Sequence, residues 1–160
     1  MTYDLHRQWD YGNPHSFDQC DSGICTRSYI NLMETTNALS MITKAGVANN
    51  KIFVREASYG RSFYMAQDGC WGPMCDFTGS KMKSDAKPGR CTNSGGYLAD
   101  AEVVEIIRRG QSTRNFYDDA SNSDIMLSQG RLQYPAHKLY LILKTNRTCH
   151  RGLRQLYDAI

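Results

Sequence analysis

The chain contains 160 residues, of which 19 are basic and 16 acidic, and its formal net charge is +3. Because the two signs are mixed along the chain, no basic run indicates binding to nucleic acid. No window approaches the ~18 consecutive apolar residues of a membrane span, and the first residues lack the charged and apolar segments of an export signal. We therefore expect no nucleic-acid partner, no membrane span and no signal peptide within this chain.

The N-terminal segment combines a short apolar stretch with a loop-like one. Residues 1–5 are apolar enough to form the end of a strand, and residues 4–14 are rich in aromatic side chains, carboxylates and turn formers. Such a composition suits a loop that lines a binding site. A disordered N-terminus is the simpler alternative, and composition alone favours it.

A helix and a strand are expected next. Residues 31–45 carry apolar side chains at helical spacing, with Asn31 as the N-cap, Glu34 in the position of a capping box and Gly46 at the end. Residues 51–59 form an apolar run rich in β-favouring side chains, which predicts a buried strand.

This order of elements suggests a fold with a known location for its site. A helix, a short loop and a strand form the repeating unit of a (β/α) barrel, whose active site lies at the C-terminal ends of its strands. Ser58, Tyr59 and Arg61 are then candidate site residues. A complete barrel needs roughly 250 residues, so we expect only part of one here.

The second half of the chain predicts a small α+β unit after an irregular region. Residues 64–90 contain glycines, prolines and a cysteine pair, so we expect a long insertion without a regular element. A helix is expected from Asp100, its predicted cap, to Gly110, which ends it. A hairpin is expected at 114–118 and 124–128, a strand at 139–143 and an amphipathic helix at 148–160.

Six cysteines are many for a cytosolic domain of this size. Cys20 and Cys25 flank four residues, Cys70 and Cys75 flank another four, and Cys91 and Cys149 remain. These spacings and the scattered histidines fit a zinc site poorly, so loop-closing disulfides are favoured over a metal site. The sequon Asn146-Arg-Thr148 agrees weakly with a secreted protein.

Several motifs occur along the chain in a fixed order. They are Met1-Thr-Tyr-Asp-Leu-His with Trp9, the run that begins Asn31-Leu-Met-Glu-Thr-Thr, Ala57-Ser-Tyr-Gly-Arg-Ser-Phe63, Gly72-Pro-Met-Cys-Asp-Phe-Thr-Gly79 and Lys87-Pro-Gly-Arg-Cys-Thr92. In this order and spacing they resemble the family 18 glycoside hydrolases, the chitinases. The later motifs resemble the secreted fungal branch, which includes killer-toxin-like subunits, and the resemblance runs from residue 1 to about residue 128.

The resemblance implies an α/β fold, a partial TIM barrel of the (β/α)8 type that contains an α+β chitinase insertion domain. Residues 1–63 would hold barrel strand six, helix six and strand seven, the last at residues 51–59. Residues 64–135 would form the insertion domain, and residues 136–160 a degenerate return toward strand eight.

The resemblance also implies site residues. These enzymes are an exception to the two-carboxylate scheme, because the substrate's own N-acetyl group attacks the anomeric carbon. Tyr3 would donate to the acetamido carbonyl, Asp4 would bind the sugar, and Met1 would pack beneath it. Trp9 would stack on a sugar on the leaving-group side, and Tyr59 and Arg61 would lie at the floor and edge of the cleft.

Some family features are missing or changed. The general acid is the Glu of an Asp-x-x-Asp-x-Asp-x-Glu motif, which these residues do not contain. Arg7 stands where the family usually has Gly, and Arg55-Glu56 where Gly-Val is usual. The family needs no metal or cofactor.

The interpretation is therefore a segment of a secreted chitinase that retains part of a cleft for chitin or chito-oligosaccharides and cannot hydrolyse them alone. The alternatives are a lectin-like remnant and a disulfide-stapled toxin or effector. Extracellular localisation is expected for the parent family. Disulfide pairing and oligomeric state are left open by the sequence, since six cysteines allow fifteen pairings.

Overall fold

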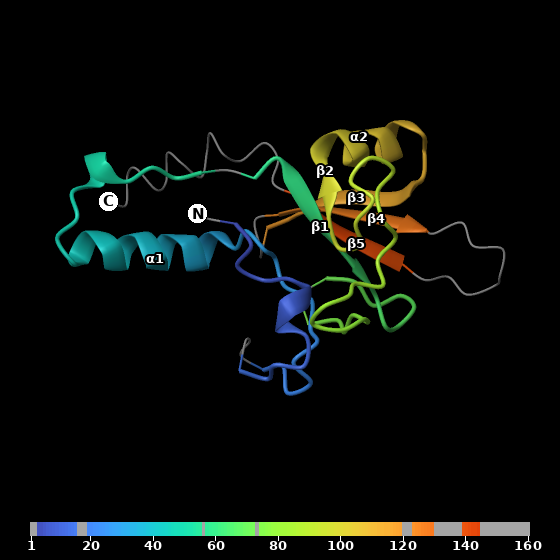
Figure 1. The fold of residues 1–160 in the computed structure, drawn as a ribbon, viewed down its shortest axis with the longest axis horizontal. Helices are drawn as coiled ribbons and strands as arrows, with labels where there is room; N and C mark the ends of the chain where they lie inside the picture. Colours follow the sequence, from blue (N-terminus) through green and yellow to red (C-terminus); the bar gives the residue numbers. More distant parts are fainter. Residues whose placement is uncertain are drawn as a thin grey trace.

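The computed structural model describes residues 3–15, 19–55, 57–72, 74–119, 123–129 and 139–144. A five-stranded antiparallel sheet in the order β2-β1-β5-β4-β3 forms its centre (Figure 1). The strands are β1 (Tyr59–Tyr64), β2 (Leu98–Ala99), β3 (Ser112–Asp118), β4 (Ser123–Gln129) and β5 (Leu139–Lys144), and the helices are α1 (Leu32–Lys44) and α2 (Asp100–Arg108). Two 3-10 turns, Gln8–Asp10 and Asn49–Lys51, complete the regular structure of the described residues.

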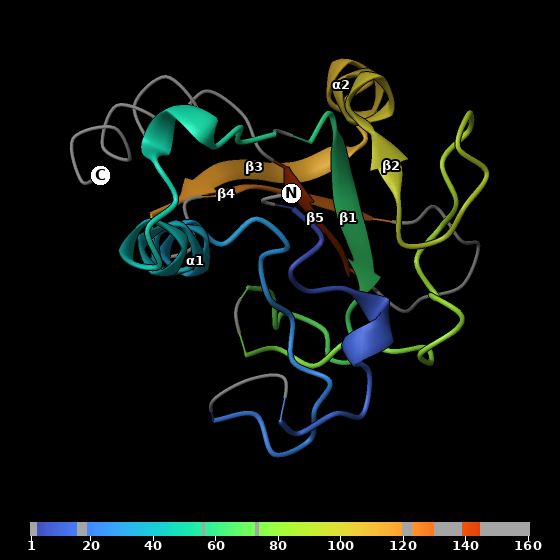
Figure 2. The same ribbon diagram turned by 60° about the vertical axis from the view of Figure 1, so that its left-hand side comes forward.

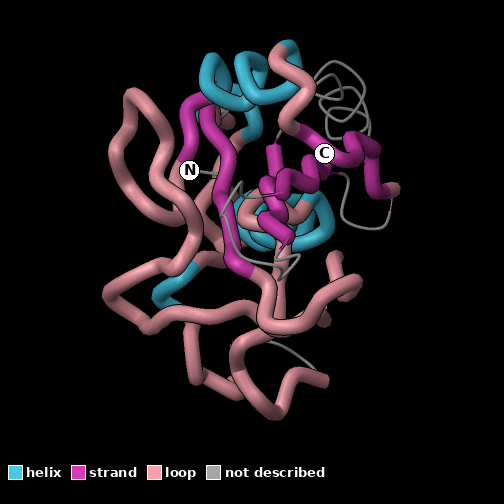
Figure 3. The backbone as a smooth tube through the Cα atoms, turned by 90° about the vertical axis from the view of Figure 1, so that its right-hand side faces the viewer, coloured by secondary structure: helices cyan, strands magenta, loops and turns pink. Residues whose placement is uncertain are grey.

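Successive side chains of β4 pack into two different clusters. Ile125 and Leu127 join Phe63 of β1, whereas Met126 joins Val103 of α2. Because side chains alternate across a strand, these clusters lie on opposite faces of the sheet. Helix α2 covers one face, and the N-terminal and disulfide-closed loops cover the other, as the views in Figures 2 and 3 show.

The loops below the sheet are joined by backbone hydrogen bonds and closed by two disulfides, Cys20–Cys25 and Cys70–Cys75. Thr26 N donates to Cys75 O at 2.8 Å, which ties one closed loop to the other. The prediction of loop-closing disulfides is confirmed for these two pairs. Cys91, also expected as a possible disulfide cysteine, is free and exposed, and Cys149 lies outside the described residues.

Helix α1 confirms the prediction for residues 31–45. The Asn31 side chain accepts hydrogen bonds from Met33 N at 3.0 Å and Glu34 N at 3.2 Å, as an N-cap does. The predicted role of Glu34 in a capping box is wrong, because its carboxylate instead binds the His6 ring 28 residues earlier. The helix projects away from the sheet (Figure 1) and is not long and apolar enough to span a membrane, as holds for every helix in the described part of the chain.

The predicted strand at residues 51–59 is wrong. Residue 51 ends a 3-10 turn, residues 52–55 have no regular structure, and Phe53 is 86% exposed. A parallel barrel strand takes its hydrogen bonds from neighbouring strands, and no strand of the described residues runs beside 52–55. The strand instead begins at Tyr59 and pairs antiparallel with β5 and β2.

The N-terminal residues likewise form no strand where they are described. Met1 and Thr2 lie outside the described residues, and 3–5 are irregular, with Leu5 N donating to Tyr29 O at 3.0 Å. The strand expected at residues 1–5 is therefore not formed over 3–5. The physical reason is the same, since no strand of the described residues lies alongside.

The α+β unit of the second half is confirmed. Helix α2, the β3–β4 hairpin and strand β5 lie where the sequence predicts them, and residues 65–72 and 74–97 contain no helix or strand. The helix cap differs, because Ala99 is the N-cap and Asp100 the first helical residue. The helix expected at residues 148–160 lies outside the described residues.

Candidate functional site

A partly buried ion pair joins the N-terminal segment to β1. The Arg61 Nε and Nη2 atoms both donate to Asp4 Oδ1, at 2.8 and 2.6 Å. Arg61 is only 8% exposed, and Asp4 has the left-handed backbone value φ = 60°, which Asp adopts more readily than most residues. Residues 57 positions apart in the sequence are thus held in one fixed arrangement.

Four tyrosines surround this pair. The Tyr59 ring stacks on Tyr29 with centroids 5.5 Å apart, lies 4.9 Å from Tyr97 and meets the edge of Tyr3 at 6.0 Å. The Tyr29 hydroxyl also donates to the Tyr59 carbonyl. Because β1 side chains alternate, Tyr59 and Arg61 project to the face that the N-terminal loops cover.

The guanidinium of Arg61 lies against two of these rings. Its central carbon is 5.1 Å from the Tyr59 centroid and 5.5 Å from that of Tyr97. Burial, and then hydrogen bonding to Asp4 and its negative charge, raise the pKa of Tyr59 to about 12, against an opposing effect of Arg61. The Tyr59 hydroxyl therefore stays protonated at physiological pH and can donate a hydrogen bond.

Trp9 lies on the neighbouring 3-10 turn. Gln8 is buried and its Nε2 donates to Thr78 O at 3.2 Å, while Arg7 N donates to Asp10 Oδ2 at 3.1 Å. These bonds fix the turn, and Trp9 itself is 42% exposed. The Arg7 guanidinium carbon lies 3.7 Å from the centroid of the Trp9 ring. The turn therefore presents an aromatic ring, covered by a cation on one face, beside the Asp4–Arg61 pair.

Sequence comparison relates most of the chain to fungal chitinases. It is 47% identical over 129 residues to secreted chitinase LysM12 of Penicillium expansum, covering 79% of this chain and 9% of the relative. It is 49% identical over 133 residues to probable chitinase LysM11 of the same fungus, covering 79% of this chain and 12% of the relative. The chain is a relative of the family 18 chitinases. A further relative is the killer toxin subunits alpha/beta of Kluyveromyces lactis, 30% identical over 130 residues that are 81% of this chain and 10% of the relative.

Solved family 18 structures share the fold. A GH18 chitinase from Cycas revoluta, solved in complex with (GlcNAc)4, matches with a TM-score of 0.67 at 16% identity, covering 99% of this chain and 38% of that one. The class V chitinase from Nicotiana tobaccum gives a TM-score of 0.66 at 16% identity, covering 99% of this chain and 39% of that one. The chain thus spans about a tenth of the length of the curated relatives it matches, and under half of the length of the solved chitinases. No model of a known protein family matches the chain.

The structure of this chain brings four of the predicted site residues together. Tyr3, Asp4, Tyr59 and Arg61 form one cluster, and Trp9 lies on the adjacent turn. Met1 lies outside the described residues. Within the described part of the chain no cluster of His, Cys, Asp and Glu could hold a metal ion. The role of these residues in binding stays a prediction.

Sequence reasoning did not single out two members of this cluster and one residue that holds the N-terminal segment in place. Tyr29 and Tyr97 flank Tyr59, and His6 anchors the N-terminal segment. Tyr97 follows two glycines and directly precedes β2, and this position between a turn and a strand is the signal that could have drawn attention to it. The contacts of Tyr29 depend on a loop path that no local pattern predicts.

His6 connects this segment to helix α1. Its Nε2 lies 2.9 Å from Glu34 Oε1, and its Nδ1 lies 3.7 Å from Asp10 Oδ2. Burial disfavours the charged ring, but the hydrogen bonds and negative charges of Asp10 and Glu34 outweigh it and raise the pKa of His6. The protonated ring therefore stabilises the folded chain.

The free energy of unfolding should fall as the pH rises through the pKa of His6. A raised folded-state pKa contributes stability that is complete below the unfolded value of about 6.5 and is lost as pH rises through the folded value. Urea midpoints of the parent should fall across this window, and those of His6→Asn should fall less. The exposed His15→Asn variant serves as the control. Equal pH slopes for the parent and His6→Asn would contradict the prediction.

Proposed function

We propose that this chain is a segment of a chitinase-type catalytic domain that binds β-1,4-linked N-acetylglucosamine oligomers. In this proposal residues 1–63 correspond to part of the barrel, residues 64–135 to the insertion domain and residues 136–160 to the return toward strand eight. The binding residues are Tyr3, Asp4, Trp9, Tyr59 and Arg61. The secreted relative supports an extracellular location for the parent protein.

The Asp4–Arg61 pair, joined by two hydrogen bonds within a set of tyrosines, carries this proposal. Arg61 and Tyr59 both interact with the Asp4 carboxylate, and its two oxygens together offer about four lone-pair sites, so it can also accept a hydrogen bond from a hydroxyl or amide. Tyr59 supplies a protonated phenol beside it. Fixed polar groups next to aromatic rings suit a sugar, which has hydroxyls on its edges and an apolar face.

The family chemistry gives these groups a role. Substrate-assisted hydrolysis requires the acetamido group to be held in line with the anomeric carbon, and such positioning can supply a large share of the rate. In the proposal Tyr3 donates to the acetamido carbonyl and Asp4 binds the sugar. Trp9 supports a unit on the leaving-group side with the face of its ring that Arg7 does not cover.

We expect binding without turnover by this chain alone. Protonation of the departing oxygen needs a positioned acid, and the Asp-x-x-Asp-x-Asp-x-Glu motif does not occur in these 160 residues. Asp4, the acidic residue of the cluster, accepts two hydrogen bonds from Arg61 through its Oδ1 atom. A further polypeptide segment carrying the acid would be needed for hydrolysis.

The test measures retention of the chain on chitin beads and calorimetric binding of the N-acetylglucosamine tetramer. We expect retention by the parent, and a loss of roughly two- to tenfold in affinity for Trp9→Ala, because aromatic contacts contribute about 0.5–1.5 kcal/mol beyond the area they bury. Tyr3→Phe should weaken binding less, since only a hydroxyl is removed.

Two outcomes would contradict the proposal. Absence of any binding by the folded parent would favour a stapled toxin or effector without a role for sugars. Release of shorter oligomers by the parent would overturn the expectation of inactivity. The exposed Lys51→Ala variant, on the arm formed by α1 and residues 46–55, is the matched control for both assays.

A further inference from the structure

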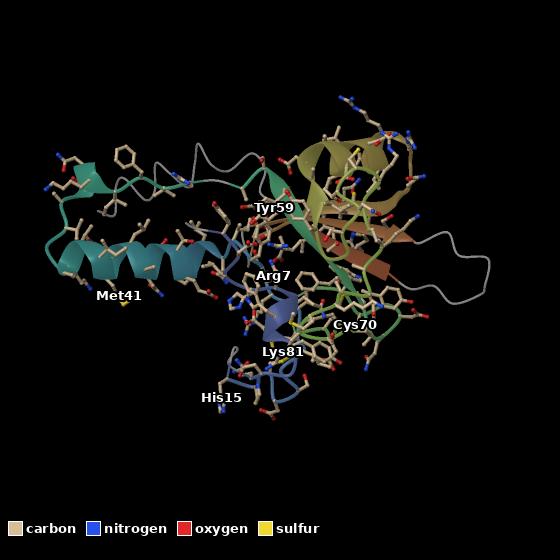
Figure 4. The ribbon with its side chains drawn as sticks, viewed as in Figure 1. Arg7, His15, Met41, Tyr59, Cys70 and Lys81 are labelled. Carbon is tan, nitrogen blue, oxygen red and sulfur yellow. A yellow bond between two sulfur atoms is a disulfide. The ribbon has the colours of Figure 1, made fainter. Side chains whose placement is uncertain are left out.

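Arg7 occupies a position that the binding role described above does not use. Its guanidinium carbon lies 3.7 Å from the centroid of the Trp9 ring, and Figure 4 shows Arg7 close to Tyr59, with which it interacts electrostatically. No residue in the described ranges accepts a hydrogen bond from the Arg7 side chain or forms an ion pair with it. Within the described residues its five N–H donors therefore have no protein acceptor.

The other charges at this edge are paired. Arg61 is bound by Asp4, and His6 lies between Glu34 and Asp10. Among the described residues, Arg7 is thus the cation of this group without an acidic hydrogen-bond partner.

Electrostatic coupling connects Arg7 to the proposed site. Burial and then the positive charge of Arg61 lower the pKa of Arg7, while Asp4, Tyr59 and Asp10 oppose this. An arginine keeps its charge at every pH of interest. A sugar unit lying between Trp9 and Asp4 would therefore pass within range of a permanent positive charge.

We propose that Arg7 is a specificity-determining residue, which favours N-acetylated sugar units by repelling the ammonium group of deacetylated glucosamine units. This inference rests on the proposed function. The two kinds of unit have the same ring and differ at the nitrogen, where the acetamido group is neutral and the free amine is cationic at mildly acidic pH. Selection against the wrong ligand by like-charge repulsion is a common source of specificity.

The turn allows Arg7 to be changed while its neighbours stay in place. It is the backbone N–H of Arg7 that donates to Asp10, and the Gln8 side chain independently holds the turn to Thr78. Replacement of the side chain therefore retains both bonds. Arg61 offers no such test, because its replacement would also release Asp4.

The experiment compares the affinities of the N-acetylglucosamine tetramer and the glucosamine tetramer for the parent, Arg7→Gln and Arg7→Lys at mildly acidic pH. We expect the parent to prefer the acetylated tetramer, and Arg7→Gln to lower this preference roughly three- to thirtyfold, as one repulsion between nearby unit charges near a surface predicts. Arg7→Lys should retain most of the preference. Added salt should reduce the preference of the parent more than that of Arg7→Gln.

The controls separate this inference from the proposed function. Lys51→Gln removes a positive charge from the exposed arm and should leave the preference unchanged. If the parent binds the acetylated tetramer and Arg7→Gln keeps the parental preference, the inference alone is overturned. If the folded parent binds neither tetramer, the proposed function and the inference both fail.

Discussion

Replacement of Glu102 by Ala is expected to lower the free energy of unfolding by about 2 kcal/mol, because it leaves three partly buried N–H groups without their charged acceptor. The Glu102 Oε1 atom accepts from Cys91 N at 2.6 Å and Thr92 N at 3.1 Å, and Oε2 accepts from Ala99 N at 2.9 Å. The side chain thus fastens the loop at 89–92 to the start of α2. Gly89 belongs to the same contact, since a Cβ there would lie 2.3 Å from Glu102 Oε1.

Urea denaturation followed by tryptophan fluorescence measures this effect, with Glu105→Gln as the control. Glu105 is on the same helix but forms exposed ion pairs with Arg90 and Arg109, which are worth at most about 1 kcal/mol. Glu102→Gln should fall between the two, because its amide keeps one acceptor but turns a donor toward an N–H group. Equal midpoints for Glu102→Ala and Glu105→Gln would show that the three bonds contribute nothing.

The pH dependence of the Glu102 contribution has a definite sign. Burial disfavours the carboxylate, but the backbone donors of Ala99, Cys91 and Thr92 outweigh it and lower the pKa of Glu102. A lowered pKa contributes stability that is present above the unfolded value of about 4.3 and is lost as pH falls through the folded value. Below that window the parent should approach Glu102→Gln in stability.

The elements that the sequence predicts well are those set by nearby residues. Asn31 caps α1 through its own side chain, and Gly110, with φ = 64°, ends the turn after α2. The polar residues 119–122 separate two strands that pair directly with one another. In each case the physical cause lies within a few residues of the element, so a single sequence contains the signal.

The strand expected at residues 51–59 shows where such reasoning fails. Its apolar run satisfies strand propensity, but a parallel strand forms only beside strands distant in sequence. The same limit applies to the site. Family motifs singled out Tyr3, Asp4, Tyr59 and Arg61, but the stacking of Arg7 on Trp9 depends on the geometry of a 3-10 turn that neither propensity nor motif predicts.

Replacement of Arg61 by Met is expected to destabilise the fold by about 2–4 kcal/mol and to abolish measurable sugar binding. The substitution keeps the apolar stem but leaves the Asp4 carboxylate without its two donors, and breaking a buried pair on one side commonly costs about 3–5 kcal/mol. The lower value is expected because the Asp4 side chain is still 22% exposed and can recover water. Arg61→Lys should give an intermediate result, since an ammonium lacks the planar fork that bonds one oxygen twice.

A double-mutant cycle with Asp4→Asn distinguishes the pair from the general effect of changing a buried residue. Asn keeps an acceptor and tolerates the left-handed backbone of residue 4, so this variant removes the charge with little added strain. We expect the double variant to lose less stability than the sum of the losses of the two single variants, by about 1 kcal/mol or more. The reason is that the second change no longer leaves an unpaired charge behind. Strict additivity, together with undiminished tetramer binding by Arg61→Met, would mean that the Asp4–Arg61 contact neither stabilises the chain nor shapes its proposed site.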